Sequence, residues 1–250
     1  MANLPNPLDR MWGNDHSNAS KKYNFDPGPP SFTWAKSITF PLYRYSASKR
    51  IDDLFRTGQI WLSPLLQFRD TVAFNQAQAD ATEGQIELAY FDSDAGMPVV
   101  AHVLAQNQWT ICCSEVRDDD FMCNAFEADS CFEISSLEFF LAINRKMAPF
   151  SNACLMDKIV YLPEERERIW PKDGDTIFAG CFKRSKHARQ REVRPMWEPK
   201  DPPLSSGLHH DLREDQCSAH AKRYLANEHK RCQGMLIDCP DALRYARKVF

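Results

Sequence analysis

Two polar residues suited to ligand binding occur close together early in the chain. Arg44 lies at the end of an alternating segment, and Ser63 ends a short apolar run just before Pro64. Because proline cannot donate a hydrogen bond to a strand ladder, Pro64 should stop its strand. Both polar groups then fall near the ends of what we expect to be neighbouring strands, which predicts a ligand site. Two competing interpretations are that Arg44 pairs with Asp70 or Glu83 and that Ser63 is an ordinary turn residue.

A single carboxylate lies in a strongly basic stretch later in the chain. Glu192 follows and precedes several lysines and arginines between residues 183 and 194. It is interpreted either as a surface carboxylate in a lattice of salt bridges or as a site residue. The basic stretch itself is typical of a solvated sheet edge. It is also a candidate surface for phosphate, of a nucleotide or of nucleic acid, although it has no interleaved aromatic residues that would stack bases.

A symmetric pair of cysteine and histidine motifs near the C-terminus has the spacing of metal ligands. The motifs are Cys217-x-x-His220 and His229-x-x-Cys232. Residues three apart share a helix face, so zinc is one interpretation, but tight Cys-x-x-Cys knuckles are absent and the region has the pattern of a polar helix. We therefore expect no metal. A cysteine nucleophile needs a histidine and an orienting acid, and no local pattern singles out one cysteine for that role.

Composition excludes several classes of protein. The chain has 250 residues, of which 43% are hydrophobic and 12% aromatic, enough for one large core. A net charge of −3 gives no general attraction to nucleic acid or anionic membrane. No segment has the apolar length of a membrane span, and residues 1–36 lack the apolar run of a signal peptide. The nine cysteines, two of them adjacent, predict a reduced, cytoplasmic protein.

The elements that must position Arg44 and Ser63 have recognisable boundaries. Residues 38–43 alternate as a half-buried strand does. Ser46 or Ser48 is the expected N-cap of the following helix, and Gly58 supplies the left-handed residue that ends it. Residues 59–62 then form a second short strand. The sequence thus predicts strand, helix and strand in succession.

The rest of the chain continues to mix strands with single helices. Strands are expected over residues 85–90, 109–114, 131–134, 158–162, 192–194 and 235–238, and residues 98–105 form either another strand or a short helix. Helices are expected over residues 121–128, after a cap at 118–120, from a capping box at 135–138, and over 175–182, 219–231 and 241–249. The predicted organisation is a flexible arm over residues 1–36, a core α+β domain over 37–198 and a helical extension over 199–250 packed on the core.

The order of these motifs resembles the bacterial domain-of-unknown-function family 2971. Members of that family are similar in a Leu-Tyr-basic-Tyr start, a helix ending in glycine and an aromatic-Leu-Ser-Pro strand. A Phe-x-Asp turn, a strand ending in serine, an acidic aliphatic strand and a late Glu-x-Arg strand follow. The corresponding segments here are Leu42–Tyr45, Gly58, Trp61–Pro64, Phe68–Asp70, Ile111–Ser114, Cys131–Ile134 and Glu192–Arg194. The resemblance covers residues 40–194.

More distantly, the layout is similar to the ADP-ribosyltransferase fold. In that fold a basic residue on the first strand contacts the diphosphate or ribose of NAD, and a serine on the second strand supports the nicotinamide-ribose pocket. A late glutamate hydrogen-bonds the ribose hydroxyl and stabilises the oxocarbenium ion. The resemblance therefore implies that Arg44, Ser63 and Glu192 are catalytic. The NAD-binding set that it implies is Tyr43, Arg44, Tyr45, Ser63, Asp70 and Arg194.

These assignments are physically consistent. Loss of nicotinamide builds positive charge on the ribose carbon, and a fixed carboxylate there stabilises the transition state more than the ground state. The planar fork of Arg44 suits a diphosphate, and Tyr43 or Tyr45 can stack on nicotinamide or adenine.

The sequence therefore predicts an α+β protein with an ADP-ribosyltransferase-like split mixed or antiparallel sheet flanked by helices. The expected function is NAD-dependent transfer of ADP-ribose to a protein or nucleic-acid acceptor, or NAD hydrolysis. The resemblance implies a toxin, defence or host-modifying factor of a bacterium or phage. The alternative is a non-catalytic nucleotide- or protein-binding regulatory module of the same fold. No membrane partner is expected, and the sequence sets no oligomeric state.

Overall fold

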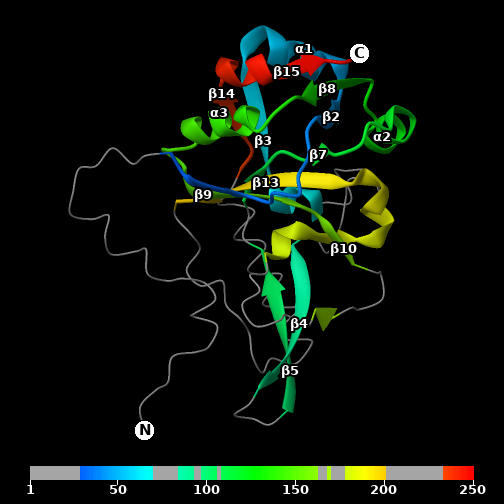
Figure 1. Ribbon diagram of the computed structural model, residues 1–250, viewed down its shortest axis with the longest axis vertical. Helices are drawn as coiled ribbons and strands as arrows, with labels where there is room; N and C mark the ends of the chain where they lie inside the picture. Colours follow the sequence, from blue (N-terminus) through cyan, green and yellow to red (C-terminus); the bar gives the residue numbers. More distant parts are fainter. Residues whose placement is uncertain are drawn as a thin grey trace, which may run out of the picture.

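A curled, mostly antiparallel sheet with few helices forms the body of the protein (Figure 1). The computed structural model describes residues 29–69, 84–92, 97–105, 108–162, 168–169, 178–200 and 233–250. The predicted class, α+β, is confirmed at this level. No helix among these residues is long and apolar enough to cross a membrane.

Strand β13, Glu192–Pro199, is the centre of the main sheet. On one side it pairs with β6 (Trp109–Thr110) and β7 (Cys113–Ser114), and on the other with β9 (Ser151–Lys158), all antiparallel. The strand order is β14 (Met235–Asp238), β3 (Gln59–Pro64), β6, β13, β7, β2 (Leu42–Ser46), β8 (Ser130–Ile134) and β15 (Ala246–Lys248). Strand β1 (Ser31–Trp34) adds to β9 in parallel. The predicted strand at 109–114 is therefore two short strands with a break at Ile111 and Cys112.

The strand–helix–strand unit at the start of the core is confirmed, with changes at its ends. Strand β2 spans Leu42–Ser46, α1 spans Ser48–Thr57 and β3 spans Gln59–Pro64. Gly58 ends α1 with φ of 74°, as predicted, because a left-handed residue closes the last turn. The predicted serine cap is wrong: Ala47 is the N-cap residue and makes no side-chain cap hydrogen bond.

The two faces of the sheet are covered differently. The side chains of Leu42, Cys113 and Val193 point to one face of the sheet and belong to the main apolar core. Residues of α1 and of α3, Glu138–Lys146, complete this core. The other face has its own small cluster around Tyr45 and the helix α2, Asp119–Phe126. Because neighbouring residues of a strand point to opposite faces, the strand register decides which side chains can meet.

The remaining strands of the main sheet are β8 (Ser130–Ile134), β14 (Met235–Asp238) and β15 (Ala246–Lys248). The predicted helix over residues 241–249 is wrong. A 3-10 turn at Pro240–Tyr245 leads into β15, which pairs antiparallel with β8. The described part of the C-terminal region thus supplies two strands to the sheet: β14, where a strand was expected over residues 235–238, and β15, where the sequence predicts a helix.

The predicted helix caps are partly confirmed. Asp118 caps α2 by accepting a hydrogen bond from the backbone N–H of Phe121. The capping box at residues 135–138 is not formed as predicted, since Leu137 is the N-cap residue of α3 and makes no side-chain cap hydrogen bond.

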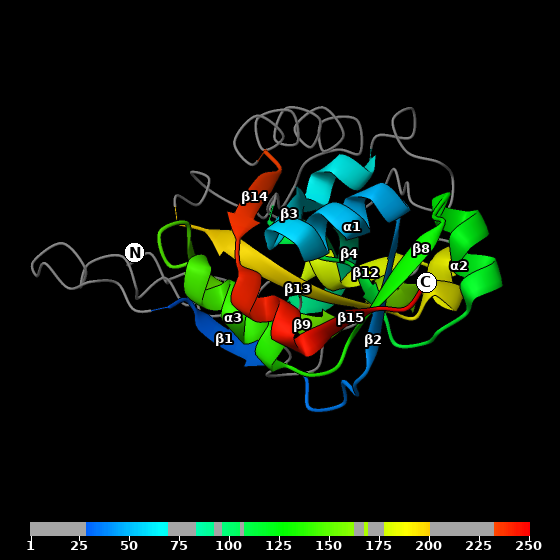
Figure 2. The same cartoon turned by 90° about the horizontal axis from the view of Figure 1, so that it is seen from above.

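A layer of short elements lies on the β13 face opposite α3. It comprises β10 (Val160–Leu162), the 3-10 turn η4 (Ala179–Cys181), β12 (Phe182–Arg184) and the 3-10 helix η5 (Ser185–Gln190). Beyond this layer, β4 (Gln85–Asp92), β5 (Met97–Leu104) and β11 (Arg168–Ile169) form a three-stranded sheet that projects from the body (Figure 1). Figure 1 shows both α1 and α3 above β13, and seen from above the two helices lie on either side of the line of that strand (Figure 2).

Several predictions fall wholly or partly outside the described residues. Of the predicted arm, residues 31–34 form β1 and residues 1–28 are outside. The helix predicted over 175–182 is only partly described, as η4 and the start of β12. The helix over 219–231, the metal-ligand motifs at 217–232 and Asp70 are also outside.

Candidate functional site

Glu192 lies in a buried ion cluster formed with Lys183 and Arg194. The Lys183 ammonium contacts Oε2 of Glu192 at 2.9 Å. The Arg194 guanidinium donates to Oε1 from both Nε and Nη2, each at 2.9 Å. The side chains of Lys183, Glu192 and Arg194 are 4%, 4% and 0% exposed. The interpretation of Glu192 as a surface carboxylate is therefore wrong, while its membership of a salt-bridge network is confirmed.

The cluster keeps Glu192 ionised. Burial by itself would raise the pKa of Glu192, but the charges of Arg194 and Lys183 outweigh it and hold the pKa well below its usual range. The neighbouring Cys112 thiol, in contrast, has its pKa raised to about 12, first by burial and then by the Glu192 charge. Glu192 is thus a fixed anion at neutral pH, and Cys112 is a neutral thiol.

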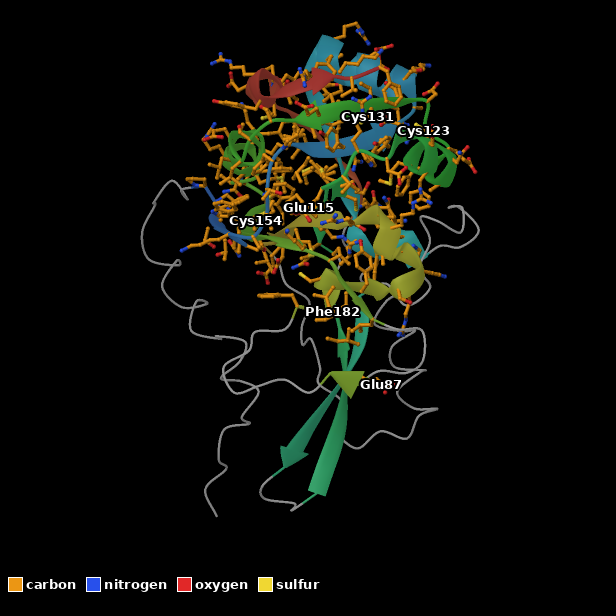
Figure 3. The ribbon with its side chains drawn as sticks, turned by 45° about the vertical axis from the view of Figure 1, so that its right-hand side comes forward. Glu87, Glu115, Cys123, Cys131, Cys154 and Phe182 are labelled. Atoms are coloured by element: carbon orange, nitrogen blue, oxygen red, sulfur yellow. The ribbon has the colours of Figure 1, made fainter. Side chains whose placement is uncertain are left out.

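Backbone and side-chain contacts enclose the ion cluster on the face of β13 that carries Glu192. Arg194 Nη1 donates to the carbonyl oxygen of Gly180 at 2.8 Å, and the Tyr161 hydroxyl accepts from the Glu192 backbone N–H at 2.8 Å. The Gln190 carbonyl accepts a hydrogen bond from Ser114 at 2.8 Å. Figure 3 shows Phe182, which precedes Lys183, between the main sheet and the projecting hairpin. The elements η4, β12 and η5 therefore cover Glu192.

Arg44 lies on the opposite face of the sheet from Glu192. In the register, Tyr43 is opposite Ser114 and Ser114 is opposite Glu192, so those three residues share one face. Arg44 is next to Tyr43 in the middle of β2, which continues to Ser46, and it faces the other way, toward the main core. Its Nη1 donates to the Cys112 carbonyl at 2.7 Å. Because Arg44 lies in the middle of β2, the prediction that it sits near a strand end is wrong.

Ser63 shares the face of Glu192 but lies at the other end of β13. Ser63 is opposite Thr110, and Thr110 is opposite Met196. Met196 is four residues beyond Glu192, about 13 Å along a strand at the usual rise per residue. Ser63 is a further two strands across. Arg44, Ser63 and Glu192 are therefore not brought together around a single point.

The predicted stacking tyrosines also have other contacts. The Tyr45 hydroxyl donates to Asp119 at 2.8 Å, and burial followed by this hydrogen bond raises the pKa of Tyr45 far above its usual value. Tyr43 is half-buried and packs against the cluster that contains Tyr45. Among the predicted NAD-binding residues that the structure describes, Arg194 directly contacts Glu192.

Sequence reasoning missed how Lys183 and Tyr161 contribute. The sequence groups Lys183 with a basic run typical of a solvated edge, yet Lys183 is buried against Glu192. The sequence predicts only a strand for Tyr161, yet its hydroxyl accepts a hydrogen bond from the Glu192 backbone N–H. No signal in the sequence pairs either residue with Glu192, because the contacts depend on how η4, β12 and η5 fold over β13.

Metal and thiol chemistry receive no support from the described residues. No group of three or more histidine, cysteine, aspartate or glutamate side chains there could hold a metal ion. Burial raises the pKa of Cys131 to about 12 and that of Cys154 well above its usual range. Raised pKa values are the opposite of what a nucleophilic thiolate requires.

Comparison of the chain with protein-family models, with curated proteins and with solved structures finds no match. The contacts described above therefore carry the functional argument.

Proposed function

We propose that this protein is a non-catalytic binding module with a regulatory role. The observation that carries the proposal is that both carboxylate oxygens of Glu192 contact buried cations of the chain itself, Lys183 and Arg194, at 2.9 Å. A glutamate that stabilises an oxocarbenium ion needs an oxygen directed at the ribose carbon. Both carboxylate oxygens of Glu192 are already directed at Lys183 and Arg194, so neither is directed at a ribose carbon.

The energetics of the cluster strengthen this proposal. A buried carboxylate is stable only while its charge is paired, and removing a partner leaves an uncompensated charge in a dry site. A ribose that competed with Lys183 or Arg194 for Glu192 would replace an ion pair with a neutral hydroxyl. This exchange is energetically unfavourable. The cluster is therefore better suited to stabilising the fold than to binding the ribose of NAD.

A protein partner fits the surface better than a nucleotide does. Trp61 on β3 and Leu236 on β14 are opposite each other in the register and are 50% and 54% exposed. Within the described residues β14 pairs with β3 alone, so it is an edge strand of the main sheet. Exposed apolar side chains on an edge strand favour pairing with another polypeptide.

The second candidate is the ADP-ribosyltransferase or NAD glycohydrolase function implied by the resemblance to family 2971 and to the transferase fold. One observation favours it: Glu192 is ionised and contacts Arg194, as a glutamate acting beside a phosphate-binding arginine would be. On this hypothesis NAD is the substrate and a macromolecule accepts ADP-ribose.

NAD titration calorimetry and a nicotinamide-release assay separate the two candidates. We expect wild-type protein to release no nicotinamide above the rate in buffer. Release that is lost in Glu192→Gln and kept in the control Glu198→Gln, on the same strand, would overturn the binding-module proposal. NAD binding without release in all three proteins would identify a nucleotide-binding module in place of a protein-binding one.

A comparison of captured proteins tests the proposed partner class. A Trp61→Ser/Leu236→Ser double variant should lose a partner that wild type retains, and Phe150→Ser, which alters another exposed apolar residue, should keep it. If every captured protein is retained equally by all three, the edge formed by β3 and β14 is not the binding surface.

A further inference from the structure

Residues 178–190, which comprise η4, β12 and η5, form a strap across the face of β13 that carries Glu192. We propose that this strap is a separately opening element, latched by the Lys183–Glu192 ion pair, and that its closure is what withholds Glu192 and Arg194 from ligands. This inference concerns a movement of the fold and does not rest on which function is proposed above.

Many of the contacts that hold the strap are polar. Its buried side chains are the small Ala179 and Cys181 and the polar Lys183, His187 and Gln190. None of its residues belongs to the main apolar core that joins β13 to α1 and α3. An element with small buried apolar side chains opens more readily than the core strands beneath it, because less apolar surface resists opening.

The charged contacts are divided between strap and strand in a way that defines a latch. Arg194 and Glu192 both belong to β13, so their ion pair persists whether the strap is closed or open. Lys183 belongs to β12 and crosses from the strap to Oε2 of Glu192. Cutting the Lys183 contact therefore weakens the strap's attachment while the strand keeps its own ion pair.

Further contacts set the closed position of the strap. Gly180 gives its carbonyl to Arg194, and a Cβ at Gly180 would meet the Met196 sulfur at 2.8 Å. Glycine thus permits a close approach of η4 to β13. The Ser114 hydroxyl donates to the Gln190 carbonyl at the far end of the strap. Lys183 lies between these two backbone anchors on β12, which also pairs in parallel with β10, and Arg189 of η5 forms an ion pair with Asp118 at 2.9 Å. Loss of the Lys183 charge removes the side-chain contact that joins β12 to Glu192 of β13.

Hydrogen exchange measured by mass spectrometry tests the proposal on the full chain. Lys183→Met removes the charge and keeps most of the side-chain volume; Lys186→Met is the control, because Lys186 is an exposed lysine of the same strap. We expect strap peptides of Lys183→Met to exchange at least about tenfold faster than in wild type, with β13 and α3 peptides within about twofold. Lys186→Met should match wild type throughout.

Two results would overturn the proposal: an unchanged strap in Lys183→Met, or equal acceleration of the strap and β13. If Lys183→Met does not fold, exchange of wild-type protein at increasing denaturant decides. Strap amides that exchange through an opening with a smaller denaturant dependence than β13 amides support a separate element. Strap and β13 amides that exchange together at every denaturant concentration refute it.

Discussion

Replacing Glu192 with glutamine removes the charge at the centre of the buried ion cluster and keeps the shape of the side chain. Lys183 and Arg194 then remain buried without the anion that both contact at 2.9 Å. Breaking a buried ion pair from one side costs about 3–5 kcal/mol, and because an amide oxygen still accepts one hydrogen bond we expect the lower end, about 3 kcal/mol. For a domain of this size that lowers the melting temperature by about 6–12 °C.

The pH dependence gives this prediction a second, independent readout. The pKa of Glu192 is depressed in the folded state, so its contribution to stability is present above the unfolded pKa of about 4.3 and is lost as the pH falls below it. The difference between wild type and Glu192→Gln should therefore be full at pH 7 and shrink in acid.

Glu198→Gln is the matched control on the same strand, and its effect should have the opposite sign. Burial raises the pKa of Glu198, so its charge opposes folding at neutral pH, and the amide should be neutral or slightly stabilising. Chemical denaturation of wild type, Glu192→Gln and Glu198→Gln at pH 7 and pH 3.5 measures the differences in unfolding free energy at both pH values. An unfolding free energy of Glu192→Gln within about 0.5 kcal/mol of wild type at pH 7 would refute the reasoning.

Two further substitutions test the placement of other residues. Gly58→Ala should cost at least about 1–2 kcal/mol in a denaturation curve, because φ is 74° and the new Cβ would lie 2.8 Å from the Pro240 Cβ; an unchanged midpoint would contradict the left-handed cap. Arg44→Met should cost about 2 kcal/mol by removing the charged donor to the Cys112 carbonyl, whereas Arg50→Met, an exposed change on α1, should cost little. Equal effects of the two arginine changes would show that the Arg44 contact does not stabilise the fold.

Local patterns in the sequence were enough to predict the elements whose identity is set locally. The helix α1 between two strands, its end at Gly58 and the Asp118 cap of α2 agree with the prediction, and the predicted bounds of the short strands β3, β8 and β14 are within one or two residues of those observed. Each depends on residues within one or two turns or on simple alternation. The C-terminal segment was mispredicted as a helix because β15 exists only through its pairing with β8, more than 100 residues earlier.

The candidate site was less predictable because it depends on register and on coverage. Sequence reasoning selected Arg44 and Glu192 together, but the pairing of Tyr43 with Ser114 and of Ser114 with Glu192 sends Arg44 to the other face. The basic residues around Glu192 suggested a solvated edge. The strap buries Lys183 there, and no periodicity reveals which face of a strand a distant segment will cover.

The most direct test of the central claim is the carbon NMR signal of the Glu192 carboxylate, assigned by its absence in Glu192→Gln and followed with pH and with added NAD. The account predicts an ionised carboxylate that begins to titrate only well below pH 4 and a chemical shift that saturating NAD leaves unchanged. A carboxylate that titrates near pH 4.3, or a signal that moves when NAD is added, would contradict a structural Glu192 enclosed by Lys183 and Arg194.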